Sequence, residues 1–206
     1  MKVLLINGSP HRKGCTYTAL NEISKSLNEE GIETEIFHIG VDSIRGCIAC
    51  GQCKSTFRCV FKDGVNAAIE KMETCDGLIV GSPVYYASAN GTLVSFLDRM
   101  FYASARKMAY KPAAAIVSAR RAGTTASFDQ LNKYFMINNM PVVSSQYWNM
   151  VHGNSPEEVL QDEEGLQIMR RLGKNMAWML KCIENGKLNG INIPELEPKK
   201  ITNFIR

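Results

Sequence analysis

Short apolar runs alternate with amphipathic helical patterns along the whole chain. Apolar runs bounded by Gly, Pro, Asn or Ser are typical of buried strands, and strict alternation of apolar and polar residues is typical of a strand with one face in water. The pattern predicts five strands, the second of them an alternating edge strand, at residues 2–6, 32–39, 77–81, 113–117 and 141–145. Strands that alternate with helices in this way indicate an α/β protein with a parallel sheet.

The helical stretches have apolar residues three and four positions apart, which gives each helix one inner face. Gly31 is expected to end the first helix, and Asp63 is expected to cap the second. The last helix is predicted to run from about residue 155 to residue 183. The inner faces are expected within residues 19–27, 65–72, 93–101, 128–135 and 166–183.

Five strands with intervening helices predict a flavodoxin-like doubly wound parallel sheet, strand order 2-1-3-4-5, with helices on both faces. The domain is expected to span residues 1–185, with a cysteine loop at 46–60 inserted after the second strand and an irregular tail at 186–206. Right-handed crossovers bring every strand-to-helix loop to one edge of such a sheet, and ligands bind at that edge. We therefore expect the chemistry of the protein there.

Composition narrows the class of partner. A chain of 206 residues, with 45% hydrophobic and 21% charged residues, is ordinary for one globular domain. The net charge is only +4 and basic residues occur in pairs such as Arg12-Lys13, so no nucleic-acid partner is expected. No apolar stretch approaches the roughly 18–20 residues of a membrane span, and the run at 2–6 is too short for a signal peptide. We expect a cytoplasmic protein with no membrane partner, whose seven cysteines stay reduced.

The loop after the first strand, from Gly8 to Thr16, opens a helix. Free backbone N–H groups and the positive end of the helix dipole suit a phosphate at such a place, and the hydroxyls of Ser9 and Thr16 can donate as well. The loop has neither the Gly-Lys-Ser/Thr of a Walker A motif nor the Gly-x-Gly-x-x-Gly of a dinucleotide fingerprint. Its position after the first strand favours a phosphate site over a solvated turn.

Two further loops on the same edge suit a flat ring. Residues 82–91 combine small residues, which let a ring approach the backbone, with Tyr85 and Tyr86, which can stack on it. Residues 118–125 carry donors for the polar edge of a ring. Taken singly, each loop also fits packing or a solvated surface, and the lone His38 is interpreted as structural. The residues expected to shape a substrate pocket after the fifth strand are Trp148, Asn149 and His152, of which His152 is again interpreted as structural rather than catalytic.

Three motifs carry a resemblance to a known family. They are Gly8-Ser9-Pro10 with Thr16, the stretch from Asp76 to Tyr86, and Leu97-Asp98-Arg99. Together they resemble the NADPH-dependent FMN reductase family of flavodoxin-like proteins. The resemblance is greatest to its iron–sulfur flavoprotein branch, which places a compact cysteine motif after the second strand. It covers residues 1–185 and leaves the tail outside.

The resemblance implies FMN along the sheet edge, with its phosphate on the first loop, its ring and ribityl chain beside the third-strand loop, and its pyrimidine edge at the fourth. The implied FMN-binding residues are Ser9, His11, Arg12, Lys13, Cys15, Thr16, Pro83, Val84, Tyr85, Tyr86, Asn90, Gly91, Ser118, Arg120, Gly123 and Thr124. The family commonly has Arg in place of His11 and Asn in place of Cys15, so phosphate binding is expected to depend more on Arg12 or Lys13. Asp63-Gly64 replaces the usual Asp-Asp.

A cluster of cysteines lies within residues 46–59. Its members are Cys47, Cys50, Cys53 and Cys59. Their spacing resembles the ligand run of a [4Fe–4S] cluster, and Gly46 and Gly51 allow tight turns. Structural zinc more often uses two separated Cys-x-x-Cys pairs, but zinc, metal-free thiols and a redox-active pair all stay open. Outside the loop, Cys75 and Cys182 are predicted to be core thiols, and Cys15 to line the phosphate loop.

Two functions are expected from these features. In the first, FMN takes hydride at N5 from NAD(P)H and passes electrons to a small acceptor such as a quinone, a free flavin, or a nitro or azo compound, with no catalytic side chain required. In the second, an iron–sulfur flavoprotein relays electrons from a ferredoxin-like donor through a [4Fe–4S] cluster to FMN. The resemblance also implies a homo-oligomer, either dimer or tetramer. The physiological donor and acceptor stay open.

Overall fold

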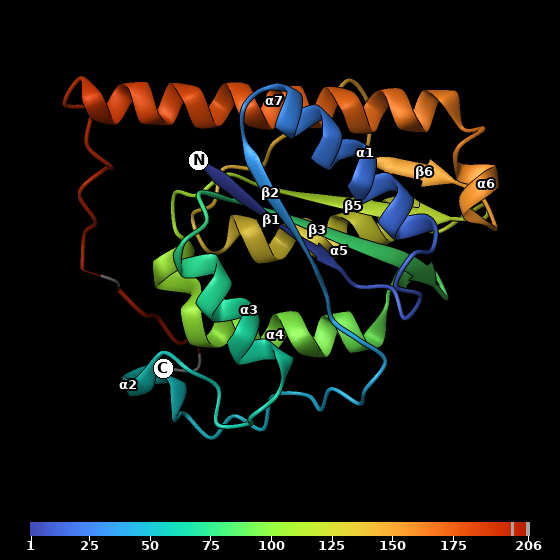
Figure 1. Cartoon of the computed structure of the whole chain (residues 1–206). Coiled ribbons are helices and arrows are strands. Elements are labelled where there is room, and N and C mark those ends of the chain that lie inside the picture. The colour runs from blue at the N-terminus through green and yellow to red at the C-terminus, as the bar shows by residue number, and fades with distance from the viewer. Residues whose placement is uncertain (199, 205–206) are drawn as a thin grey trace.

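Five parallel strands form the centre of the molecule in the order β2-β1-β3-β5-β6, as the computed structural model shows (Figure 1). The structure describes residues 1–198 and 200–204. A sixth, two-residue strand, β4, pairs antiparallel with the end of β3. The strands are β1 (Lys2–Asn7), β2 (Glu33–His38), β3 (Gly77–Tyr85), β4 (Ser88–Ala89), β5 (Ala113–Ala119) and β6 (Met150–His152). The flavodoxin-like order predicted from the sequence is confirmed.

Helices cover both faces of the sheet (Figure 1). One face packs on α1 (Cys15–Glu29) and α7 (Glu163–Leu188), through a core that includes Leu20, Ile23 and Leu172. The other face packs on α3 (Gly64–Glu73), α4 (Gly91–Met108) and α5 (Thr124–Met136). Two short helices, α2 (Cys53–Thr56) and α6 (Pro156–Val159), lie in connections. Because β1, β3 and β5 are buried on both faces, they need continuous apolar runs, which is the pattern that the sequence displays.

The edge strand β2 also agrees with its alternating pattern. It pairs on one side only, with β1, and its residues are half-buried or exposed. Asp63 caps α3 as predicted, because its carboxylate accepts a hydrogen bond from the backbone N–H of Val65 at 3.2 Å.

The predicted fifth strand at 141–145 is wrong in position. Val142 forms only an isolated bridge with Ala113, and the chain then leaves the sheet until β6. The amide of Asn149, buried at the edge of β5, donates to the carbonyl of Ala115 at 3.1 Å and so replaces part of the missing ladder. Pro141 has no N–H to donate, which favours an interrupted edge strand over a continuous one.

The predicted last helix is two helices. The carboxylate of Asp162 accepts from the N–H of Gly165 at 2.9 Å and caps α7, and it also accepts from the N–H of His152 at 2.7 Å. A helix that ran straight through residue 162 would lose both bonds. Helix α7 then continues to Leu188, past the predicted end at residue 183.

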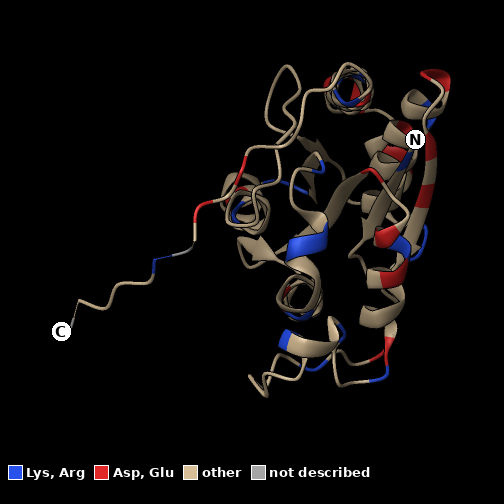
Figure 2. Cartoon of the chain, turned by 90° about the vertical axis from the view of Figure 1, so that its left-hand side faces the viewer, with Lys and Arg blue, Asp and Glu red and all other residues tan. Residues whose placement is uncertain are grey.

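The carboxyl ends of the parallel strands meet at one edge, hereafter the rim, as Figure 1 shows. Figure 2 shows charges of both signs interspersed over the surface elements. Within residues 1–198 and 200–204, no helix is long and apolar enough to cross a membrane.

Candidate active site and cysteine pocket

The first loop of the rim follows β1 and is organised by two buried polar side chains. Asn7 accepts from the N–H of Ser9 at 3.1 Å through its Oδ1 and donates to the carbonyl of Arg12 at 3.2 Å through its Nδ2. The hydroxyl of Ser9 in turn accepts from the N–H of His11 at 3.1 Å. The sequence reasoning did not single out Asn7, although a polar residue at the end of a buried apolar strand was the available signal.

Helix α1 begins at the end of this loop with an open N-terminus. Its N-cap residue, Gly14, provides no side-chain acceptor, so the first-turn N–H groups and the helix dipole suit an anion. Thr16 lies in this first turn, is buried, and has its hydroxyl 2.8 Å from the hydroxyl of Ser118. This contact joins the loop after β1 to the end of β5.

The cations near the first loop are exposed. Arg12 and Lys13 line a pocket with Tyr17 and the end of β2, so both side chains reach toward that strand. His38, at the end of β2, has its Nε2 2.8 Å from the carbonyl of Ser9. Because a carbonyl can only accept, Nε2 carries the proton. His38 therefore fixes the first loop, in agreement with its interpretation as a structural residue.

The loop after β3 is a tight hairpin between β3 and β4. Its two central residues, Tyr86 and Ala87, have φ of 50° and 57°, which is the left-handed geometry of a type I′ turn. The amide oxygen of Gln130 on α5 accepts from the hydroxyl of Ser88 at 2.8 Å and from the N–H of Ala89 at 3.0 Å. Left-handed backbone at residues other than glycine costs free energy, and its occurrence at the rim, where ligands bind in such sheets, is typical of a functional site. The hairpin presents both Tyr85 and Tyr86 to solvent.

The loop after β5 packs directly on this hairpin. Gly123 has φ of +85°, and a Cβ there would lie 2.6 Å from the Cα of Ala87. Asn90 is buried, accepts from the N–H of Thr92 at 2.8 Å, and donates its own N–H to the hydroxyl of Ser82 at 3.0 Å. The structure thus brings the loops after β1, β3 and β5 together, as the sequence predicted. Arg120 is exposed beside them.

The residues after the fifth strand are brought together only in part. His152 lines a small pocket with Tyr147 and Asp162, whereas Asn149 is buried under β5. Trp148 is half exposed and packs edge-on against Tyr147, with ring centroids 4.7 Å apart.

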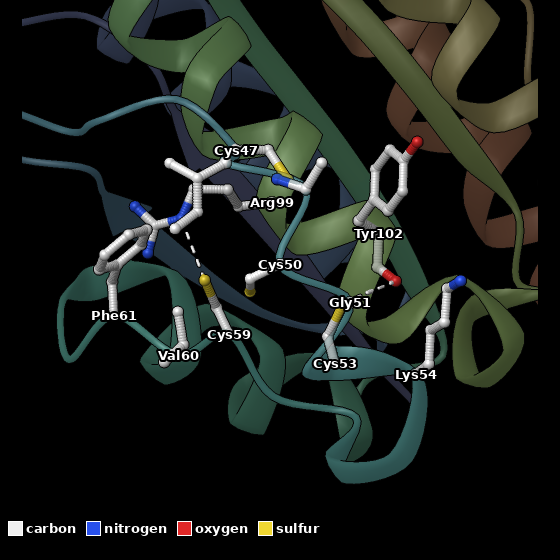
Figure 3. A pocket seen from close by; sticks show the side chains of 12 residues that line it. Cys47, Cys50, Gly51, Cys53, Lys54, Cys59, Val60, Phe61, Arg99 and Tyr102 are labelled. Atoms are coloured by element: carbon white, nitrogen blue, oxygen red, sulfur yellow. Dashed lines mark hydrogen bonds between the residues drawn. The ribbon is translucent and has the colours of Figure 1, made fainter.

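The four clustered cysteines line one pocket of about 220 Å³ (Figure 3). Cys47 and Cys50 lie on the loop, Cys53 begins α2, and Cys59 precedes α3. Burial raises the pKa of Cys53, and the nearness of the other three thiols raises it further. The remaining lining residues include Arg99 and Tyr102, both from α4.

Arg99 is a buried cation in contact with this pocket. Its Nε donates to the Sγ of Cys59 at 3.1 Å, and its two terminal nitrogens donate to both carboxylate oxygens of Asp63 at 2.7 and 2.9 Å. Desolvation lowers the pKa of Arg99, but the hydrogen bonds to Asp63 and Cys59 outweigh it, so the net pKa lies above the ordinary arginine value. Arg99 is therefore charged. The sequence placed Arg99 in a family motif without giving it this role.

The four thiols of this pocket are a donor set of the kind that iron–sulfur clusters use, since such clusters are held by four Cys thiolates. Within the described residues, 1–198 and 200–204, no three His, Cys, Asp or Glu side chains are close enough to hold one metal ion.

The position of this pocket corrects one expectation. The cysteine loop was expected to share the rim with the flavin, but residues 39–62 leave the end of β2 and run back below α3 and α4 (Figure 1). The pocket packs against the middle of α4, where Arg99 and Tyr102 lie, and not against its first turn.

The three remaining cysteines differ from one another. Cys75 is buried, and burial raises its pKa, in agreement with a core thiol. Cys182 is exposed on α7, so its prediction as a core thiol is wrong, because it lies on the outer face of that helix. Cys15 is half-buried beside the first loop, with its Sγ 3.7 Å from the carbonyl of Gly153.

The sheet and its rim define a flavodoxin-like α/β protein. A solved archaeal flavodoxin has the same fold, with a TM-score of 0.61 at 15% identity over 88% of this chain and 99% of that one. Residues 1–155 match the NADPH-dependent FMN reductase family. The chain belongs to that family and is a flavin-dependent oxidoreductase.

Relatives named iron–sulfur flavoproteins agree with the predicted branch. One from Methanocaldococcus jannaschii is 32% identical over 192 residues, which are 89% of this chain and 100% of the relative. Another, from Methanosarcina thermophila, is 26% identical over 91% of this chain and 99% of the relative.

Proposed function

We propose that the protein binds FMN at the rim and passes electrons from NAD(P)H to a small acceptor such as a quinone, a free flavin, or a nitro or azo compound. The observation that carries the proposal is the meeting of three loops at one edge, where Thr16 contacts Ser118 and Gly123 contacts Ala87. Each loop supplies what one part of FMN requires: anion binding, a backbone that a ring can approach, and polar donors.

The phosphate would lie at the N-terminus of α1, near the hydroxyls of Ser9 and Thr16 and the backbone from His11 to Cys15. Both hydroxyls are already fixed by hydrogen bonds, so little order has to be gained on binding. Arg12 and Lys13 would add charge from the β2 side. His11 and Cys15 replace the Arg and Asn common in the family.

The ring and ribityl chain would lie between the hairpin and the loop after β5. Residues Pro83 to Tyr86, with Asn90 and Gly91, would border them, and residues Ser118 to Thr124 would meet the pyrimidine edge. The bound flavin supplies hydride and electron transfer at its N5 position, while the protein orients the ring and shields one side from water. No side-chain acid or base is needed.

A second candidate function is supported by the cysteine pocket. In it, Cys47, Cys50, Cys53 and Cys59 would hold a [4Fe–4S] cluster, which would supply one-electron transfer between a ferredoxin-like donor and FMN. Four thiols around one hollow, with a buried cation bonded to one of them, favour a cluster over free thiols. Reduced thiols of this kind suit the cytoplasm, which we propose as the location.

The separation of pocket and rim bears on this relay. Helix α4 starts at the rim, and at 1.5 Å per residue Arg99 stands about 12 Å further along its axis. A homo-oligomer, dimer or tetramer, in which the flavin of a neighbouring copy approaches the pocket would shorten the path. Sedimentation of the loaded protein tests the assembly, and a monomer would contradict it.

The experiment is anaerobic purification, with absorption spectra and assays for flavin, iron and sulfide. We expect bound FMN in the wild type and, for the second candidate, iron and labile sulfide that Cys50→Ala abolishes while the exposed Cys182→Ser retains them. Flavin without iron, even after reconstitution with iron and sulfide, contradicts the cluster only. Failure to bind added FMN contradicts both candidates.

Stopped-flow mixing of the FMN-loaded protein with NADH or NADPH then tests the donor. Bleaching of the flavin absorbance at a rate that saturates with the nicotinamide supports the first candidate. Flavin reduction by reduced ferredoxin, but not by either nicotinamide, favours the second.

A further inference from the structure

We propose that Arg99 is a positioning residue for the redox centre of the cysteine pocket: its Nε–H bond to Cys59 holds that ligand and raises the reduction potential of the cluster. The proposal rests on the cluster proposed above. It concerns an interaction across the fold, between helix α4 and a loop residue 40 positions earlier in the chain.

Arg99 stands where an apolar residue would be expected. It lies on the buried face of α4 between Phe96 and Met100, and its own side chain is 1% exposed. Burying a guanidinium is costly, and an apolar side chain of similar volume often serves stability as well or better. A role beyond packing is therefore indicated.

The guanidinium cannot rotate freely. Asp63 holds its two terminal nitrogens in a bidentate pair, and one of them also donates to the carbonyl of Arg45 at 3.2 Å. Asp63 is fixed in turn because it caps α3 through Val65. Because both terminal nitrogens of the guanidinium are occupied by Asp63, the remaining Nε–H donates to the Sγ of Cys59.

Cys59 is also held through its backbone. The side chain of Asn66 on α3 accepts from the N–H of Cys59 at 2.8 Å and donates to its carbonyl at 2.9 Å. Cys47 and Cys50, by contrast, lie on the exposed part of the loop. Cys59 is thus held at two points: its backbone bonds to α3 through Asn66, and its sulfur accepts a hydrogen bond from Arg99 on α4.

The chemical consequence follows from charge. Reduction adds one electron to the cluster and makes its thiolate ligands more negative, so a donor at the ligand sulfur binds the reduced form more strongly. Such a bond raises the reduction potential. Lysine keeps the positive charge but has a single terminal nitrogen in place of the planar guanidinium. It therefore cannot form a bidentate pair with Asp63 and also donate an N–H to Cys59.

The test is the midpoint potential of the reconstituted cluster in the wild type and in Arg99→Lys, from dithionite titration followed by electron paramagnetic resonance. We expect roughly a tenfold loss of preference for the reduced state, which for a one-electron couple is a shift of about 59 mV to more negative potential. Circular dichroism checks that Arg99→Lys is folded. The iron content of the folded variant should be lower than that of the wild type.

Arg45→Gln is the matched control. The guanidinium of Arg45 lies 4.8 Å from the centroid of the Phe61 ring, and that of Arg99 lies 4.9 Å from the same centroid. The control therefore removes a positive charge from the same surroundings while the hydrogen bond from Arg99 to the sulfur of Cys59 stays intact, and it leaves the Arg45 carbonyl in place. We expect a clearly smaller shift. Equal shifts in the two variants, or none in Arg99→Lys, overturn the proposal.

A measurement on the wild type covers the case in which Arg99→Lys does not fold. Pulsed electron paramagnetic resonance of the reduced cluster, in protein labelled with ¹⁵N at arginine Nε, should show a ¹⁵N hyperfine coupling. A reduced cluster without that coupling overturns the proposal while leaving the cluster itself standing. A wild type that takes up no iron overturns both, and leaves the flavin proposal intact.

Discussion

The hydroxyl of Thr16, in the first turn of α1, lies 2.8 Å from the hydroxyl of Ser118, at the end of β5. Both side chains are buried, and they come from opposite halves of the chain. The contact fixes the phosphate end of the proposed flavin site to the loop at its pyrimidine end. A side chain at either position therefore affects the whole site.

Thr16→Val should weaken FMN binding. The change keeps the shape of the side chain but removes a hydroxyl near the proposed phosphate, and a hydrogen bond to a charged group is worth about 1.5–3 kcal/mol, or roughly 10- to 100-fold in affinity. Quenching of FMN fluorescence on titration measures it. Thr18→Val is the control, since its hydroxyl only reaches back to the carbonyl of Gly14 at 3.3 Å and should leave affinity unchanged. Equal affinities for wild type and Thr16→Val would contradict the placement of the phosphate.

Gly123→Ala should disturb the site through the backbone. The new Cβ would lie 2.6 Å from the Cα of Ala87, and the left-handed φ of +85° adds about 1–3 kcal/mol of strain. The hairpin must shift, so we expect FMN affinity to fall at least tenfold, with a lower thermal midpoint. Gly64→Ala is the control, because a Cβ there meets only ordinary contacts at 3.8 Å or more. Unchanged affinity in Gly123→Ala would mean that the hairpin does not border the flavin.

Stability should depend on pH through Glu35. Hydrogen bonds from Lys2 and Lys71 hold the pKa of Glu35 below its usual value of 4.5. A lowered folded-state pKa stabilises the protein above the unfolded-state pKa, and the benefit is lost as the pH falls through the folded value. Glu35→Gln should therefore lower the free energy of unfolding by about 0.5–1 kcal/mol at pH 7, given the partial exposure of Glu35. At a pH below the folded-state pKa of Glu35, the substitution should change the free energy of unfolding by almost nothing.

Urea denaturation of wild type and Glu35→Gln across that pH range measures the effect. Glu33→Gln, exposed on the same strand, is the control and should change little at any pH. A difference between wild type and Glu35→Gln that persists undiminished into acid would exclude the ion pairs as its cause.

The two cysteines outside the rim and the pocket should differ in reactivity. Cys182 is exposed, whereas Cys75 is buried with a raised pKa, so few Cys75 thiolates are both formed and accessible. Alkylation of Cys75 in the native protein should be on the order of a hundredfold slower, because it requires a local opening. Mass spectrometry after timed iodoacetamide treatment measures both rates. Similar rates would show that the α3–β3 turn opens readily.

The sheet was predictable because its signals are local. The apolar runs of β1, β3 and β5 each end at the rim in loops rich in small and polar residues, so the order of strands and the meeting of loops followed from the sequence. Strand β6 was missed because three residues after Asn149 carry too weak a pattern, while Val142 and Val143 carry a stronger one that the edge of the sheet uses only briefly.

The contacts that shape the pocket could not be read from the sequence because they are long-range. An arginine on the apolar face of α4 signals a buried and paired cation, but its partners, Cys59 and Asp63, lie 40 and 36 residues away. The break before α7 was hidden for a different reason. Asp162 is an ordinary helix surface residue by composition, and only its bonds to Gly165 and His152 show that it ends one helix and starts another.

Helix α4 begins at Asn90 and Gly91 on the rim and runs without a break to Arg99 at the cysteine pocket. A ligand at one end that shifts this helix would change the free energy of binding at the other end. Thermodynamic linkage makes this coupling reciprocal, so whatever factor FMN adds to the retention of a cluster, the cluster adds to the affinity for FMN. If both proposed cofactors bind, the order in which they are loaded changes the path of assembly but not the stability of the doubly loaded protein.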